Sequence, residues 1–392
     1  MQNDMRNNQF NKICGSLKRF ELSNGDFSYL PLEDLTKVPL GAAGKWLTKD
    51  EFAGLVINRV WGVIYARAND DLPDPNSGNF QDIVGESVIH NIANGVIDEI
   101  NSLPLRYDAR ISLSNINVNE EVAAEYKGVR ISTIRGVIKG LLHDQHKPGF
   151  EICLSVNVEG FANYQLDSSA AVKAIESIKV VLNSWLSKRL VYIDRFRASR
   201  GGLIFNATTN HVIDKQYIGL ISCDAGGTVR AELPLDLTIA LLSMQLSDEL
   251  KSLSPNGIIE NLLRNSTDAV DLLSMDSDEA RSICAAAEWS FNSHLSENET
   301  MSFLQVCFGF EALFGDGDPK SVTKTLANRC AFAVASRVSQ RAGIVTQFEK
   351  FYQTRSKIVH GRVARLNGDD RALLSWARAL LQIAIQSETS RI

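Results

Sequence analysis

The feature that most constrains the fold is a change of hydrophobic period near residue 234. Before it, several segments alternate apolar and polar residues as half-buried strands do, whereas after it apolar residues recur every three or four positions. Breaks such as SPNG, GDGDP and LNGDD separate the later segments. Helices are expected at 235–252, 256–274, 277–295, 299–314, 321–338, 344–360 and 369–387. The C-terminal part should therefore form a helical bundle.

The first part of the chain mixes the two periods. Its patterns predict helices at 83–102 and 168–190, and strands at 109–118, 129–138, 150–158, 191–197 and 216–223. The stretches 71–79 and 224–228 read as loops, and the second lacks the GK[ST] of a phosphate-binding loop. We expect an α+β region at 1–230, possibly of two subdomains, followed by an all-α region at 231–392.

Composition narrows the class of protein. The chain has 392 residues, of which 44% are hydrophobic, as is ordinary for a packed globular protein. No apolar run approaches the roughly 18 residues that cross a bilayer, and the first residues lack a signal-peptide core. A cytoplasmic protein without membrane contact is therefore expected.

A metal site and a cofactor are not expected. The six cysteines form no CxxC and no short-range pairing with histidine, so they are expected to be buried thiols. The nearest approach to a metal-binding cluster is HDQH at 143–146. Two histidines three positions apart, without further ligands, usually arise by chance.

Charge is concentrated in one segment. Between residues 320 and 378 there are twelve Lys and Arg against three Asp and Glu, a net +9, which leaves −14 for the rest of a chain of net charge −5. Positive charge of this density on an acidic protein favours a polyanionic partner, and a solvated basic face is the alternative.

An arginine lies within an apolar stripe of the segment 344–360. At 3.6 residues per turn, the large apolar side chains in line with Arg355 are Phe348, Phe351, Tyr352, Ile358 and Val359. A guanidinium is costly to bury. Arg355 should therefore pair with a carboxylate or line a cleft that receives an anion.

The motif R-x4-H ends five residues later at His360, about 140° around an ideal helix. Gly361 is expected to form a left-handed helix cap, where His360 can turn toward the cleft. Ser356 can hydrogen-bond into the same site. The pattern R-x(4–6)-H arises about once by chance in a chain like this, so the setting of the motif on three consecutive helices decides its weight.

Two more charged residues fall on apolar stripes of the neighbouring helices. Glu311 shares its face with Leu304, Cys307, Phe308 and Phe314, and Arg329 shares its face with Val322, Leu326 and Ala333. We expect Glu311 and Arg329 to pair inside the bundle and set its register, with a direct role at the cleft as the alternative.

The run FLQVCFGFEALFGDGD…SVTKTLANRCAFAV…FEKFYQTRSKIVHGR resembles the Apea-like branch of the HEPN superfamily, four- to five-helix domains found in prokaryotic defence and toxin proteins. The matching positions are Glu311, Arg329 in LANR, and RSKIVHG from Arg355 to Gly361. The resemblance covers about 277–390, under a third of the chain, and predicts a HEPN-type bundle there.

The resemblance implies a metal-independent endoribonuclease in which two protomers join their R-x4-H motifs into one composite cleft. Arg355 and His360 would be catalytic, with Ser356 and Lys357 as supporting polar groups. The structural residues would be Glu311, Arg329 and Gly361, and the candidate RNA-binding residues are Lys350, Arg362 and Arg365. Residues 1–230 would sense a phage or cellular trigger or restrain the dimer, as in antiphage and abortive-infection systems. The RNA class stays open between tRNA, mRNA and rRNA.

The chemistry suits these side chains. Without a metal, the ribose 2′-OH is the nucleophile, so one group must take its proton and another must stabilise charge on the phosphorane. Histidine exchanges protons near neutral pH, and arginine offers a bidentate fork to phosphate oxygens. The products would carry 2′,3′-cyclic phosphate and 5′-hydroxyl ends.

Two alternatives remain. In the first, the domain is a catalytically inactive dimerisation or RNA-binding scaffold that regulates a partner protein, which the serine at 356 favours because many active members have Asn, Asp or His there. In the second, Arg355 and His360 are ordinary bundle residues, with His360 capping the helix. A strict monomer with Arg355 saturated by a carboxylate would favour the second.

Overall fold

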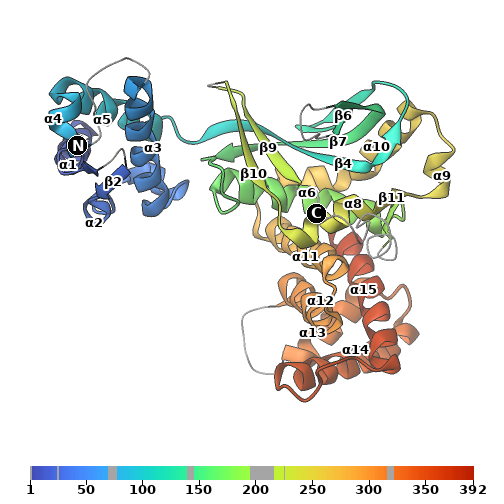
Figure 1. Cartoon of the computed structure of the whole chain (residues 1–392). Coiled ribbons are helices and arrows are strands. Elements are labelled where there is room, and N and C mark those ends of the chain that lie inside the picture. The colour runs from blue at the N-terminus through green and yellow to red at the C-terminus, as the bar shows by residue number, and fades with distance from the viewer. Residues whose placement is uncertain are drawn as a thin grey trace, which may run out of the picture. The chain divides into compact units, whose positions relative to one another are not determined.

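The computed structural model of the protein describes residues 2–23, 26–68, 77–138, 145–194, 216–224, 226–315 and 322–392 (Figure 1). The chain divides into two compact units. Unit 1 comprises Met1–Tyr107, Val158–Val172 and Ser222–Val229, and unit 2 comprises Asp108–Asn157, Lys173–Ile221 and Arg230–Ile392. The units are not consecutive along the chain, whereas the sequence predicted consecutive domains that meet near residue 230.

Unit 1 is built mainly from helices, coloured blue in Figure 1. They are α1 (Gln2–Leu17), α2 (Leu32–Leu35), the 3-10 helix η1 (Gly41–Lys45), α3 (Lys49–Ala68), α4 (Phe80–Val84) and α5 (Glu86–Asn101). A small sheet in the order β2-β1-β3 accompanies them, made of β1 (Glu21–Ser23), β2 (Asp26–Tyr29) and β3 (Ser77–Asn79). Apolar residues of α5 at helical spacing, such as Ile89, Val96 and Ile100, are buried in its core.

A six-stranded sheet follows in the order β10-β9-β4-β7-β6-β5. Its strands are β4 (Leu105–Val118), β5 (Ala123–Tyr126), β6 (Val129–Ile138), β7 (Gln145–Gly160), β9 (Tyr217–Ser222) and β10 (Thr228–Glu232). The antiparallel pair β6 and β7 places Ile131 opposite Leu154, and both are buried, so the predicted alternation gives the sheet an apolar face.

The helices α6 (Ser169–Ser187) and α10 (Pro255–Ser274) connect the sheet with the C-terminal helices. Helix α10 packs against β5 and β6, and the Trp185 indole of α6 donates a 2.7 Å hydrogen bond to the Ser266 hydroxyl of α10. The chain between them contains β8 (Val191–Ile193), α8 (Leu235–Ser243), β11 (Met244–Leu246) and α9 (Asp248–Lys251).

The segment 235–252 was predicted as one helix, and this prediction is wrong. Helix α8 ends at Ser243, because Met244 to Leu246 leave the helical conformation and pair antiparallel with β8. Strand pairing thus continues past residue 234, where the sequence pattern no longer showed it. The backbone groups released from the helix find partners in β8, so the break leaves them satisfied.

The C-terminal helices form a bundle, shown in orange and red in Figure 1. They are α11 (Asp278–Leu295), α12 (Glu299–Phe314), α13 (Val322–Val334), α14 (Val338–Val359) and α15 (Gly368–Thr389). Side chains at their N-termini accept hydrogen bonds from free backbone N–H groups: Ser277 caps α11, Asn298 caps α12 and Asn367 caps α15. These caps lie in or beside the predicted breaks.

The bundle core is rich in aromatic rings. Phe303 and Phe351 stack with centroids 4.4 Å apart, and Phe310 meets Phe348 edge to face at 4.9 Å. Gly309 lets α12 approach α15 closely, since a Cβ at this position would lie 2.5 Å from the Leu381 side chain. The predicted order, an α+β region followed by a helical region, is confirmed. None of the helices in the described segments combines the length and apolar content needed to cross a membrane.

Candidate functional site

Helix α14 carries Arg355 out of the bundle core. Phe348 and Phe351 are fully buried and Tyr352 is 6% exposed, as the stripe predicted. Arg355 continues this face one turn later, where its side chain is 33% exposed. The arginine therefore has its stem against the core and its charged end at the surface.

The Arg355 guanidinium lies beside a carboxylate of α12. Its Nη2 is 3.4 Å from Oε1 of Glu311, which also accepts from the Tyr352 hydroxyl at 3.4 Å. Both contacts are long for hydrogen bonds. The Nε of Arg355 is buried and has no hydrogen-bond partner among the described residues. One carboxylate thus satisfies only part of a group that has five N–H donors.

The position of Arg329 differs from the prediction that it pairs with Glu311. Its Nη1 donates to the carbonyl of Phe314 at 2.6 Å, at the last residue of α12. A cation at this end of a helix satisfies a free carbonyl and interacts favourably with the helix dipole. Glu311 lies almost one turn earlier, on the side of α12 that α14 covers, and so it meets Arg355.

Burial perturbs two groups beside the pair. The pKa of the Tyr352 hydroxyl is raised mainly by burial, with Cys307 and Glu311 as smaller causes. Burial also raises the pKa of the Cys307 thiol well above its usual value. Both groups are therefore neutral at physiological pH, so the local charges are those of Glu311 and Arg355. The sequence pattern assigned Tyr352 only to the core. Its position three residues before Arg355, on the same face of the helix, indicated that it could contact the same partner, Glu311.

The end of α14 forms the predicted glycine cap. Gly361 has φ +68°, its N–H donates to the carbonyl of Ile358 at 2.9 Å, and Arg362 N–H donates to the carbonyl of Lys357 at 2.8 Å. This pair of bonds is a Schellman motif. His360 is the C-cap residue, with φ −85° and ψ 12°, and its side chain is exposed. The predicted left-handed conformation of Gly361 is confirmed.

The His360 imidazole has no hydrogen bond or ion pair within the described segments, and none joins it to Arg355 there. Ser356, one turn earlier, is also exposed. The structure thus places both members of the R-x4-H motif at the surface of one helix end without joining them.

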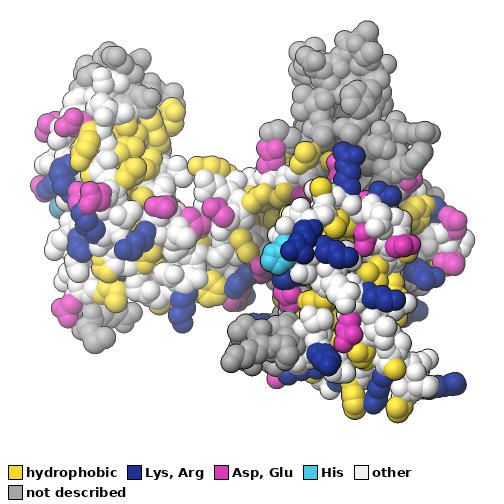
Figure 2. Space-filling view, turned by 90° about the horizontal axis from the view of Figure 1, so that it is seen from below, with side chains coloured by type: hydrophobic (Ala, Val, Ile, Leu, Met, Phe, Trp, Pro, Cys, Tyr) yellow, Lys and Arg dark blue, Asp and Glu magenta, His cyan; other side chains and the backbone are white. Residues whose placement is uncertain are grey.

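Four exposed cations lie in the C-terminal half of α14 and just after its end. They are Lys350, Lys357, Arg362 and Arg365, and none of them has an ion-pair partner within the described residues. By contrast, Arg371 on α15 pairs with Glu299 at 2.8 Å. Figure 2 shows Lys and Arg side chains with a histidine beside them on a face of the molecule. An uncompensated group of cations attracts polyanions.

No group of three or more His, Cys, Asp or Glu side chains suited to a metal ion occurs in the described part of the chain. The HDQH stretch is not part of that finding, because residues 143 and 144 and the side chains of Gln145 and His146 lie outside what the structure describes.

Comparisons of the chain with protein-family models, with curated proteins and with solved structures find no match.

Proposed function

We propose that the chain is a metal-independent endoribonuclease of HEPN type that acts in the cytoplasm in antiphage defence or abortive infection. The observation that carries the proposal is the surface at the end of α14. There, the sixteen residues from Lys350 to Arg365 hold a half-buried arginine with an unused donor, an exposed histidine and four cations, and neither the histidine nor these cations has a side-chain partner among the described residues. Phosphate binding needs the arginine and the cations, and proton transfer needs the histidine.

The reaction follows from the groups. The 2′-oxygen of a ribose attacks the adjacent phosphorus and loses its proton to a base, while the bond from phosphorus to the 5′-oxygen breaks and that oxygen gains a proton. His360 serves one of the proton transfers, and Arg355 donates N–H groups to the non-bridging oxygens. Because Arg355 and His360 do not contact each other within one chain, two protomers would complete the cleft. Residues 1–230 would sense the trigger.

The experiment incubates purified protein with total cellular RNA in EDTA, beside Arg355→Ala and His360→Ala. Gln353→Ala is the matched control, since Gln353 is exposed on the same helix and uncharged. We expect discrete fragments with 2′,3′-cyclic phosphate ends from wild type and the control, and a loss of at least about 100-fold in either site variant. Cleavage that survives both site variants would refute the assignment of the site.

A second candidate function is a non-catalytic RNA-binding scaffold that regulates a partner protein. One observation favours it: the carboxylate of Glu311 lies 3.4 Å from Arg355 and offsets its charge. This function predicts that the full chain binds RNA without cutting it. Cleavage by residues 231–392 alone would instead identify residues 1–230 as an inhibitory region.

A further inference from the structure

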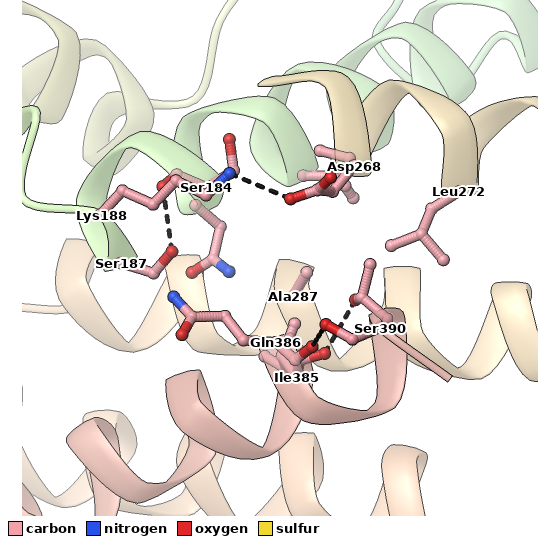
Figure 3. Close-up of a pocket in the computed structure, with 13 residues that line it drawn as sticks. Ser184, Ser187, Lys188, Asp268, Leu272, Ala287, Ile385, Gln386 and Ser390 are labelled. Carbon is pink, nitrogen blue, oxygen red and sulfur yellow. Dashed lines mark hydrogen bonds and ion pairs between the residues drawn. The ribbon is translucent and has the colours of Figure 1, made fainter. Parts of the chain in front are cut away.

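A pocket in unit 2 lies apart from the surface of α14. Its volume is about 330 Å³, and it is lined by residues of α6, α10, α11 and α15. Figure 3 shows Ser184 and Ser187 of α6 and the following Lys188 on one side, facing Ile385 and Gln386 of α15 and its C-cap Ser390, with Asp268 and Leu272 of α10 at another side. The size is at the lower end of the range for sites that hold small organic molecules.

The most informative residue of this pocket is Asn183. It is 2% exposed, and its Oδ1 has no hydrogen-bond partner among the described residues. A buried oxygen without a donor is unfavourable, so such an atom in a pocket indicates a missing donor. Because Asn183 lines the pocket, a ligand there is able to supply that donor.

The hydroxyl groups of the lining share one property: each already donates its hydrogen to a backbone carbonyl. Ser184 donates to Val181 O, Ser187 to Ser184 O, Thr389 to Ile385 O and Ser390 to Gln386 O, at 2.8 to 2.9 Å. A hydroxyl that has used its hydrogen only accepts. The four hydroxyl oxygens therefore present acceptors to the pocket, beside the carboxamides of Asn183 and Gln386.

Charge in the pocket comes from one ion pair at its rim. Lys188 Nζ lies 3.1 Å from Oδ2 of Asp268 and donates to the carbonyl of Asn265 at 2.7 Å. Lys188 thus spends two of its three donors on the protein, while the Oδ1 of Asp268 has no partner within the described residues. At the rim, the Oδ1 of Asp268 is therefore open to a hydrogen-bond donor, and the carboxylate carries negative charge.

Apart from the exposed carboxamide of Gln386, the remaining lining is apolar and buried. It consists of Val180, Ala269, Leu272, Ala287 and Ile385, each at most 7% exposed. An apolar group of a ligand gains free energy by covering these side chains. The pocket therefore combines an apolar floor with the serine and threonine oxygens, two carboxamides and one carboxylate whose Oδ1 is unpaired among the described residues.

We propose that this pocket binds a small primary amine in its ammonium form, attached to an apolar group. The ammonium has three donors and no acceptor, which complements Asn183 Oδ1, Asp268 Oδ1 and the serine oxygens. The apolar group lies on the floor formed by α10, α11 and α15. An anion is disfavoured because Lys188 is already compensated by Asp268. The proposal does not depend on ribonuclease activity.

The first experiment measures thermal unfolding and calorimetric binding of the full chain with 2-phenylethylamine, 2-phenylethanol and phenylacetate. These probes share a ring and differ in the polar group. We expect saturable stabilisation by the amine alone. Equal or stronger binding of phenylacetate, or no binding of the amine at millimolar concentration, overturns the proposal.

Variants then locate the binding site. Asp268→Asn should weaken amine binding about fivefold, because it removes one charge at contact distance, and Lys188→Gln should strengthen it by a similar factor because it removes a competing cation. Asp268 is 65% exposed, so its substitution leaves the fold intact. The matched control is Asp248→Asn, which breaks the exposed pair of Asp248 with Lys251 at 2.9 Å outside the pocket.

Asn183→Ala tests the buried acceptor. It should weaken amine binding about tenfold without lowering stability in the absence of ligand, because it removes an unsatisfied oxygen. Asn119→Ala, at an exposed position in the same unit, is the control. Unchanged amine affinity in both Asn183→Ala and Asp268→Asn would show that the amine binds elsewhere and would overturn the proposal.

Discussion

Glu311 and Arg355 approach each other from α12 and α14, with Oε1 3.4 Å from Nη2 and both side chains about one-third exposed (32% and 33%). A pair this exposed contributes little to stability, about 0 to 1 kcal/mol. The Glu311 carboxylate nevertheless offsets the positive charge of Arg355 at the end of α14. The pair is thus better placed to tune the site than to hold the bundle together.

The first prediction follows from this pair. Glu311→Gln should tighten binding of single-stranded RNA about two- to fivefold, since it removes a negative charge beside Arg355, and it should change the free energy of unfolding by less than about 1 kcal/mol. Fluorescence anisotropy in a His360→Ala background measures binding without cleavage. Glu299→Gln, which breaks the pair with Arg371, is the control. Weaker RNA binding by Glu311→Gln would contradict the proposed role of the Glu311–Arg355 pair.

The second prediction concerns the uncompensated cations. Replacing Lys350, Lys357, Arg362 and Arg365 with Gln should lower the dependence of log K on log salt concentration by up to about 3, because each phosphate contact on a single strand contributes about 0.7. RNA titrations at several salt concentrations give this slope. Arg281→Gln is the control, since Arg281 already pairs with Asp276 and Asp278. An unchanged slope in the fourfold variant would place RNA elsewhere.

The third prediction tests the cap of α14. Gly361 has φ +68°, so Gly361→Ala should cost about 1 to 2 kcal/mol of stability through backbone strain. Gly368→Ala is the matched control, since nothing lies within 4 Å of a Cβ there and its φ is ordinary, so the change should be neutral or slightly stabilising. Denaturant unfolding measures both. Equal stability of the two variants would argue against the cap.

The fourth prediction uses a buried thiol in the bundle. Burial raises the pKa of Cys330 from 9.0 to about 12. Because the folded state holds this proton more tightly, the stabilisation is fully present below pH 9 and is lost as the pH rises toward 12. Between pH 8 and pH 10 wild type should therefore lose about 1 kcal/mol more stability than Cys330→Ala. Parallel pH dependences would show that the thiol is not buried in solution.

Hydrophobic pattern was sufficient to locate most elements. The expected strand at 129–138 is β6 itself, and the expected helices at 256–274 and 299–314 agree with α10 and α12 to within one residue. Periodicity is a local property of a single segment, so it can be read from the sequence. The same holds for the N-terminal capping residues Ser277 of α11, Asn298 of α12 and Asn367 of α15.

The sequence by itself also determined that Arg355 would lie in line with an apolar stripe and that Gly361 would end the helix, because both follow from residue type and helical period. Only the tertiary structure decided that Glu311 meets Arg355 and that Arg329 bonds the carbonyl of Phe314, because these contacts depend on which helix covers the Glu311 side of α12. Strand β11 and the pocket around Asn183 were likewise decided by residues distant in sequence, β8 for the one and α15 for the other. Contacts between distant segments depend on packing, which no local pattern contains.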